Sequence, residues 1–220
     1  MIEIWTAPVG TDDPASLAKL TPQERQRAAQ LRLPLVRAAF VSSRAFLRTI
    51  LASYTGISPQ QLDFKHGSNG KPELLNYEGL HFNLSHSRTH LACAVSREFA
   101  LGIDVEDVRE MKDLEQIARR FFSPLEVSAL DELDPAARPE AFFRCWTRKE
   151  AFIKATGEGL SRGLATFAVS LTPSEPPRLH WLEDPIDSVA AWNLYSFQPA
   201  PRVFGALAWR GGPAEVRHRG

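Results

Sequence analysis

Apolar residues recur at intervals of three and four positions in several stretches of the chain, a pattern typical of helices with one buried face. In the clearest stretch, 35–54, Phe40, Leu47 and Leu51 are among the apolar positions, and Gly56 follows as a predicted helix end. Helices are predicted over 21–32, 35–54, 113–122, 124–133 and 139–155, the last closed by Gly157. Helical segments therefore lie on both sides of a central region of short apolar runs.

Three segments carry the residues of a helix-start capping box. In this motif a Ser or Thr side chain accepts from the backbone N–H three positions later. The Glu or Gln side chain at that later position accepts from the backbone N–H of the Ser or Thr. Proline in the next position favours a helix start, because its missing N–H is not needed there. The three segments are Thr21-Pro22-Gln23-Glu24, Ser58-Pro59-Gln60-Gln61 and Ser123-Pro124-Leu125-Glu126. Each is predicted to begin a helix.

Short apolar runs predict the strands. The runs 91–95 and 101–105 flank Glu98 and Phe99, and we interpret them as two strands paired through a turn. Later strands are predicted over 167–171, 179–182, 192–197 and 204–209. This order of elements is an α+β pattern with two comparable halves. We place the halves at 1–106 and 107–220, each containing both helices and strands.

The composition narrows the possible partners and locations. The 220 residues include 26 Lys and Arg against 26 Asp and Glu, so no net charge attracts nucleic acid or an anionic membrane. Cys93 and Cys145 lack metal-site spacing, which is compatible with a reducing compartment. The N-terminus lacks signal-peptide character, and no apolar run reaches the roughly 18 residues of a membrane span. We expect a soluble cytoplasmic protein that binds neither nucleic acid nor membrane.

Two carboxylates stand at the end of one apolar run. Asp104 and Glu106 are two positions apart, so the strand period puts them on the same face, with Val105 on the other. Carboxylates this close repel one another unless a cation lies between them, and an all-oxygen ligand set suits Mg²⁺. The alternative is that Asp104 only ends a strand and Glu106 is solvated.

A second cluster lies on the helix predicted over 139–155. Trp146, Glu150 and Lys154 are four positions apart and share one stripe of the helix. An ordinary Glu–Lys surface pair explains the two charges equally well. The large apolar side chain of Trp146 indicates that this stripe faces inward, where a charge pair is costly unless it meets a ligand, metal or partner.

A third cluster suits an anion. The segment 82–87 (FNLSHS) offers hydroxyls and His86, and the earlier segment 69–72 (NGKP) forms a glycine-containing turn that exposes backbone N–H groups. The alternative is that His86 is a hydrogen-bonded structural histidine. The sequence contains neither a Gly-x-Ser-x-Gly elbow nor a phosphate-binding P-loop, so serine hydrolysis and P-loop chemistry lack their usual signals.

Taken together, these segments resemble the Sfp-type 4′-phosphopantetheinyl transferases. The resemblance covers roughly residues 20–170, and the motifs occur in the family's order and approximate spacing. They are Asn69-Gly70-Lys71-Pro72, Phe82-Asn83-Leu84-Ser85-His86-Ser87, Gly102-Ile103-Asp104-Val105-Glu106, Phe121-Phe122-Ser123-x-x-Glu126 and Trp146-Thr147-x-Lys149-Glu150-Ala151-Phe152-x-Lys154. The ordered set is far more specific than any single motif.

The resemblance implies a fold and a reaction. Two similar α/β halves would be related by a pseudo-twofold axis, with coenzyme A bound in the cleft between them. A serine hydroxyl of an apo acyl or peptidyl carrier protein would attack the β-phosphate of coenzyme A, giving the holo carrier and 3′,5′-ADP. We expect a monomer, because the two halves already build the cleft.

The resemblance also assigns the catalytic residues. Asp104, Glu106 and Glu150 correspond to a Mg²⁺ cluster, and Lys154 corresponds to a pyrophosphate-contacting lysine. Glu150 is our candidate for the base that takes the serine proton, although binding the metal uses the same oxygens. Glu126 belongs to a family motif too, but its capping-box position favours a structural role.

Coenzyme A contacts follow from the same comparison. His86 resembles a phosphate-binding histidine, Lys71 and Pro72 match positions that flank the adenine, and Ser85 adds a contact near the phosphates. Lys154 joins them at the pyrophosphate.

The sequence departs from the family at the 3′-phosphate. Ala39 occupies a position where the family commonly has a basic residue. Arg37 and Arg44 lie nearby, and Arg25 and Arg27 lie on the preceding helix, so one of these arginines could hold the phosphate. The alternative is that all four form a solvated basic face.

Two other functions share this chemistry. A non-catalytic coenzyme A-binding module would keep the binding residues without turnover, although the intact carboxylates and Lys154 argue against it. A metal-dependent hydrolase of nucleotide pyrophosphates would attack with water instead of a serine hydroxyl. Only a reaction that depends on a carrier protein separates these possibilities from a phosphopantetheinyl transferase.

Overall fold

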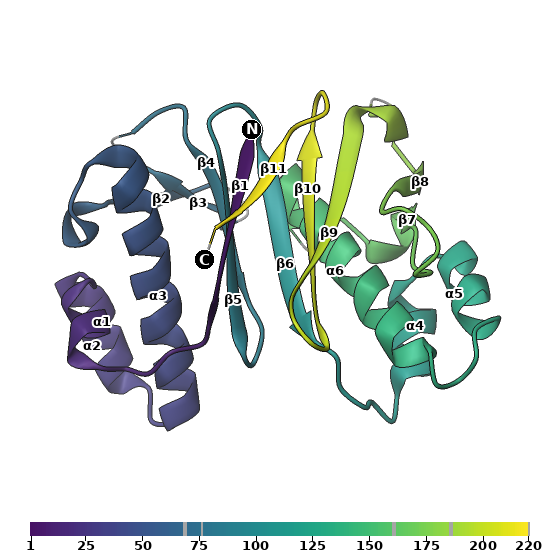
Figure 1. Cartoon of the computed structure of the whole chain (residues 1–220), viewed down its shortest axis with the longest axis horizontal. Coiled ribbons are helices and arrows are strands. Elements are labelled where there is room, and N and C mark those ends of the chain that lie inside the picture. The colour runs from purple at the N-terminus through teal and green to yellow at the C-terminus, as the bar shows by residue number, and fades with distance from the viewer. Residues whose placement is uncertain (68–69, 76, 160–161, 185–186, 220) are drawn as a thin grey trace.

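Two β-sheets lie face to face between two layers of helices in the computed structural model (Figure 1). The structure describes residues 1–219 except 68–69, 76, 160–161 and 185–186. The first sheet has the order β11 (Val216–Arg219), β1 (Ile2–Pro8), β5 (His90–Ser96), β4 (His81–His86). The second has the order β6 (Leu101–Asp107), β10 (Val203–Arg210), β9 (Trp192–Ala200). All ladders are antiparallel except that between β1 and β11.

The helices divide between the two outer layers. The layer on the first sheet contains α1 (Pro14–Ala18), α2 (Pro22–Gln30) and α3 (Pro34–Thr55), and the other contains α4 (Leu114–Phe121), α5 (Pro124–Asp131) and α6 (Arg138–Thr156). Two short hairpins complete the fold: β2 (Phe64–His66) with β3 (Pro72–Leu74), and β7 (Phe167–Val169) with β8 (Leu179–Leu182). The α+β class predicted from the sequence is confirmed.

Alternating strand residues build the core between the sheets. Leu101, Ile103 and Val105 of β6 are buried against Ile4 of β1 and Ala94 of β5. A second core fills the space between α6 and the other face of the second sheet, and a third lies between α3 and the first sheet. Both faces of each sheet are therefore covered where the strands overlap.

Two of the three predicted capping boxes are confirmed. Thr21 and Glu24 exchange side-chain to backbone hydrogen bonds at the start of α2, as do Ser123 and Glu126 at the start of α5. The prediction at Ser58 was wrong, since only a 3₁₀ turn forms over Pro59–Gln61. The reason is tertiary: Leu62 is buried in an extended conformation, and its carbonyl accepts a hydrogen bond from Arg48.

The predicted pairing of the runs 91–95 and 101–105 was also wrong. β5 pairs with β1 and β4, whereas β6 pairs with β10. The apolar face of β6 packs on the face of β5, so the turn between them carries the chain from one sheet into the next layer.

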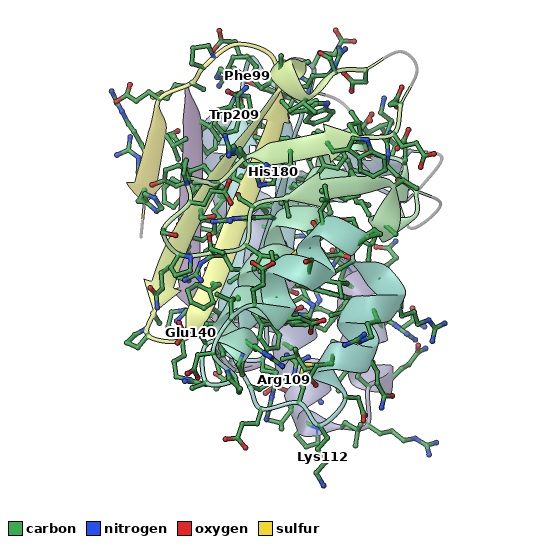
Figure 2. All side chains as sticks on the ribbon, turned by 90° about the vertical axis from the view of Figure 1, so that its right-hand side faces the viewer. Phe99, Arg109, Lys112, Glu140, His180 and Trp209 are labelled. Atoms are coloured by element: carbon green, nitrogen blue, oxygen red, sulfur yellow. The ribbon has the colours of Figure 1, made fainter. Side chains whose placement is uncertain are left out.

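The sheets draw strands from distant parts of the chain. β6 lies in the second sheet with strands that follow about 90 residues later, and β11 joins the first sheet beside β1. The proposed division at residue 106 and the pseudo-twofold relation between halves stay predictions. Figure 2 shows the two ends of the second sheet: Phe99 and Trp209 lie near one end, and Arg109 and Lys112 lie near the other.

Candidate active site

The site is built on the face of β6 that meets α6. Leu101, Ile103 and Val105 face the core, so the strand period turns the residues between them toward α6. Gly102 allows the contact, because a Cβ there would lie 2.2 Å from the carbonyl oxygen of Ala151. Asp104, the next residue on this face, contacts α6 directly, whereas Val105 is buried in the core between the sheets, as expected from the prediction that the two lie on opposite faces of the strand.

Asp104 is the centre of a buried polar cluster. It is 4% exposed, and its Oδ1 accepts from the Lys154 ammonium at 2.7 Å and from the Ser85 hydroxyl at 2.8 Å. Its Oδ2 is buried and has no hydrogen-bond partner in the part of the chain that the structure describes. A buried carboxylate oxygen without a partner is costly, so this atom is suited to a ligand.

Lys154 joins three structural elements at this point. From the last turn of α6, its ammonium donates to Asp104 and to the Ile103 carbonyl of β6, and to the Ser85 hydroxyl of β4 at 3.0 Å. The three hydrogens of the ammonium are thus all used. Glu150 lies one turn earlier on the same helix, and Lys154 is the residue of the stripe formed by Trp146, Glu150 and Lys154 that contacts Asp104.

The neighbouring carboxylates respond to Asp104. Burial and the charge of Asp104 raise the pKa of Glu106 to about 7, although Arg109, with its Nη1 3.4 Å from Oε2, opposes the shift. Burial and Asp104 also raise the pKa of Glu150, and Lys154 opposes this. Both glutamates therefore experience the like-charge repulsion on which the metal hypothesis rests.

The residues fit a divalent cation in chemistry. Asp104, Glu106 and Glu150 offer only oxygen ligands, and the unpartnered Oδ2 is a ready ligand atom. Across the described residues, however, no group of three or more His, Cys, Asp or Glu side chains converges closely enough to hold a metal ion. Asp104 Oδ1 forms an ion pair with the Lys154 ammonium. The metal assignment therefore stays a prediction.

The structure turns the half-buried Lys71 toward the protein backbone. Its ammonium donates to the backbone carbonyls of Leu101 at 2.7 Å and Lys154 at 2.9 Å, and burial lowers its pKa to about 8. Pro72, the next residue, begins β3 and is half-buried. Asn69 of the same motif lies outside the described residues.

His86 and Ser85 are separated by the pleat of β4. Ser85 is buried and bonded to Asp104, whereas the adjacent His86 is exposed at the strand end. Phe82 and Leu84, which share the strand face of His86, pack in the core beneath α3. The structure therefore brings Ser85, and not His86, into the Asp104 cluster.

The candidate arginines have other partners. Arg37 forms an ion pair with Asp12 at 2.7 Å, and Arg44 lies 4.0 Å from Glu24 with its guanidinium over the Phe40 ring. Arg25 and Arg27 are exposed on α2. The structure brings none of these four into hydrogen-bond contact with the Asp104 cluster, as far as the described residues show.

Comparisons with known proteins place the chain in a family. A sequence model described as the 4′-phosphopantetheinyl transferase superfamily matches residues 100–202. The 4′-phosphopantetheinyl transferase HetI of Nostoc sp. is 38% identical over 218 residues, which cover 96% of this chain and 88% of that protein. The chain belongs to the 4′-phosphopantetheinyl transferase family. This membership confirms the resemblance inferred from the ordered motifs.

Other members of the family are similar over shorter spans. The 4′-phosphopantetheinyl transferase psf-1 of Bacillus pumilus is 35% identical over 179 residues, covering 81% of this chain and 74% of the relative. The 4′-phosphopantetheinyl transferase Sfp of Bacillus subtilis is 34% identical over 125 residues, covering 57% of this chain and 54% of that protein.

No helix within the described ranges is long and apolar enough to cross a membrane.

Several phosphopantetheinyl transferase motif residues have structural roles that the sequence prediction missed. Glu126, already assigned to a capping box, also forms an ion pair of 2.7 Å with the fully buried Lys149. Asn83 of β4 accepts the backbone N–H of Ile103 at 2.8 Å. Asp107, which follows the motif that ends at Glu106, accepts the backbone N–H of Arg88 in the β4–β5 turn. Asn83 lies between Phe82 and Leu84 in β4, and this alternation is the signal that could have placed its side chain on the opposite face of the strand.

Proposed function

We propose that this transferase moves the 4′-phosphopantetheine arm of coenzyme A to a serine hydroxyl of an apo acyl or peptidyl carrier protein. The serine oxygen attacks the β-phosphorus, and the bond from that phosphorus to the bridging oxygen breaks, releasing 3′,5′-ADP. The serine proton passes to a base. The observation that carries the proposal is the unpartnered oxygen of Asp104 beside Lys154, in a chain that belongs to this family.

Asp104, Glu106 and Glu150 are the proposed Mg²⁺ ligands. Bound to them, the ion would supply positive charge next to the pyrophosphate oxygens. The raised pKa values of Glu106 and Glu150 support this assignment, because a cation among like charges relieves their repulsion. Glu150 is also the candidate base, since a carboxylate with a raised pKa accepts a proton more readily.

Lys154 is the proposed contact to the pyrophosphate. Because its three donors already meet Asp104, Ser85 and the Ile103 carbonyl, it must release one of these acceptors to reach a phosphate oxygen. Stabilising charge that grows during transfer is the contribution expected of this ammonium.

The coenzyme A contacts are proposed from exposure and pairing. Exposed His86 is the candidate phosphate ligand, and half-buried Pro72 flanks the adenine. Arg44 is a better candidate for the 3′-phosphate than Arg37, because its distance of 4.0 Å from Glu24 leaves it more weakly paired than Arg37, which lies 2.7 Å from Asp12.

The location and assembly are part of the proposal. Cys93 and Cys145 are free and buried, which accords with a reducing compartment such as the cytoplasm. We propose that the protein acts there as a monomer.

The test is the intact mass of a panel of apo carrier proteins after incubation with this protein, coenzyme A and Mg²⁺, with a sample lacking metal as control. A mass gain of one phosphopantetheine arm, with 3′,5′-ADP released in equal amount, is expected. Binding of coenzyme A without a mass gain on any carrier would favour a binding module. Consumption of coenzyme A without a carrier would favour a pyrophosphate hydrolase.

A further inference from the structure

The outer edge of β6 is hydrogen-bonded by side chains. One edge of β6 pairs with β10, and among the described residues no strand pairs with the other. On that outer edge, the Leu101 carbonyl accepts from Lys71, the Ile103 N–H donates to Asn83, and the Ile103 carbonyl accepts from Lys154. Unpaired backbone groups in a buried strand are costly, so these side chains replace a missing neighbour strand.

Lys71 connects β6 to α6. Besides Leu101, its ammonium binds the backbone carbonyl of Lys154, in the last turn of a helix that ends at Thr156. The last carbonyls of a helix lack intrahelical partners and carry partial negative charge, so a cation is favourable there. One ammonium thus holds the strand that carries Asp104 and the helix residue whose side chain binds Asp104.

Asn83 connects β6 to β4. Its side chain is buried, and its Oδ1 accepts the Ile103 N–H at 2.8 Å, one residue before Asp104. Ser85, two residues further along β4, reaches the Asp104 carboxylate itself. The Asn83 contact therefore fixes the position of β4 along β6 where Ser85 and Asp104 meet.

We propose that Lys71 and Asn83 are positioning residues that clamp β6 to α6 and β4 and so hold Asp104 opposite Lys154. This role differs from a position beside the adenine of coenzyme A, which the family resemblance implied for Lys71. The ammonium points at two backbone carbonyls inside the fold, and both are already within hydrogen-bond distance. The inference rests on the proposed transferase function for its kinetic consequence only.

The two roles predict different kinetics. Loss of a nucleotide contact made equally in ground and transition states raises KM for coenzyme A and leaves kcat unchanged. Loss of a clamp misplaces catalytic groups relative to the bound substrate, so kcat falls while KM changes little. Misplacement of reacting groups by about 1 Å costs on the order of 100-fold in rate.

The experiment compares Lys71→Met and Asn83→Leu with wild type and with Lys65→Met as a matched control. Lys65 is an exposed lysine of β2 that pairs only with Glu73 among the described residues. Transfer kinetics with varied coenzyme A are measured beside native-state hydrogen exchange of the protein without substrate. We expect each clamp variant to lose about 10- to 100-fold in kcat, with KM within about 3-fold of wild type.

Hydrogen exchange tests the clamp without any activity. The Ile103 amide should exchange about 10-fold faster in Asn83→Leu, and the amides of β6 and of the last turn of α6 should exchange faster in Lys71→Met. Lys65→Met should match wild type in both measurements.

Each outcome decides the inference. A raised KM with normal kcat and unchanged exchange in Lys71→Met would show that Lys71 contacts the nucleotide, and would overturn the clamp. Wild-type behaviour of both variants would overturn the clamp as well. If Lys71→Met does not fold, Asn83→Leu carries the same test through Ile103. If wild type modifies no carrier protein, the proposed function fails, while the exchange rates still decide the clamp.

Discussion

A single carboxylate holds the centre of this site. Asp104 binds Lys154 and Ser85 through one oxygen and leaves the other buried without a partner in the described structure. A side chain kept only for stability would satisfy both oxygens, because an unpaired buried acceptor costs on the order of 1–3 kcal/mol. The cost is expected where an oxygen is reserved for a ligand.

The substitution Asp104→Asn tests whether this oxygen is kept for a ligand. The amide keeps the shape of the side chain but loses its charge, so we expect carrier modification to fall about 100-fold or more while the circular dichroism spectrum stays unchanged. Addition of Mg²⁺ should raise the Tm of wild type, because binding to the native state stabilises it, and should raise the Tm of Asp104→Asn less. Exposed Asp63, replaced by Asn, serves as the control. An equal Mg²⁺ response in wild type and Asp104→Asn would contradict the assignment.

Lys71 predicts a pH dependence of stability. Burial lowers its pKa from 10.5 to about 8, so between these values the unfolded chain binds more protons than the folded one. The free energy of unfolding therefore rises with pH from about 8 to 10.5, and this contribution is lost as pH falls through 8. Relative to Lys71→Met, wild type should gain on the order of 1 kcal/mol per pH unit at most in this window.

Denaturant unfolding of both proteins at several pH values checks this prediction. Taking the difference between them removes the titration of groups that the variant leaves unchanged. The neutral amine can still donate to both carbonyls, so the fold should persist above pH 8. Parallel stability curves for the two proteins would show that the pKa of Lys71 is not lowered.

At the scale of elements, the site depends on how closely β6 approaches α6. Gly102 makes this possible, because an added Cβ would lie 2.2 Å from the Ala151 carbonyl oxygen and 2.3 Å from the Ala155 nitrogen. Both contacts are with helix backbone, which cannot rotate away as a side chain could. The distance between strand and helix also determines whether Lys154 reaches Asp104.

Gly102→Ala should therefore separate the two elements. We expect a loss of about 3 kcal/mol or more in the free energy of unfolding, together with reduced transfer activity. Gly163→Ala is a matched control, since its Cβ would meet only the Thr166 methyl group at 3.4 Å. Urea unfolding and the carrier assay measure the two effects, and wild-type stability of Gly102→Ala would refute the close packing.

Local patterns predicted the elements better than their partners. The boxes at Thr21 and Ser123 form because their hydrogen bonds lie within four residues, whereas the box at Ser58 fails because the distant Arg48 and core hold Leu62 extended. The face of Asp104 followed from the strand period. That β6 pairs with β10 could not be predicted in this way, because the partner lies about 100 residues away and no local pattern encodes it.

Within the site, the sequence predicted some side-chain roles and missed others, because contacts between distant segments decide them. The link between Asp104 and Lys154 agrees with the charges and the inward helix stripe. The direction of the Lys71 ammonium could not be predicted, because it depends on where β6 and the end of α6 meet in space. Residue type indicated a cation in this region, and only the fold showed which acceptors it meets.

At the scale of the whole molecule, residues from both ends of the chain complete the first sheet. β11 runs parallel to β1, pairing Ile2 with Val216 and Trp5 with Arg219, and the Arg219 guanidinium binds Glu3 at 2.7 Å. This short strand covers an edge of β1 that would otherwise be open to pairing with another chain.

Removal of residues 216–220 should expose that edge. We expect a lower Tm and concentration-dependent association, both measurable by scanning calorimetry and light scattering at several protein concentrations. Arg217→Ala, which removes an exposed side chain paired with Glu215, should leave both measurements near wild type. A monomeric truncated protein with unchanged Tm would show that β11 contributes nothing to the sheet.

The pairing of β1 with β11 also has a consequence for synthesis. The ribosome makes β1 first, but the strand that completes its sheet emerges only when residue 219 has left the exit tunnel. During most of translation β1 can pair with β5 alone, and β6 must wait for β10. The nascent chain therefore presents open strand edges until β10 and β11 have emerged, which makes it a candidate client for ribosome-associated chaperones.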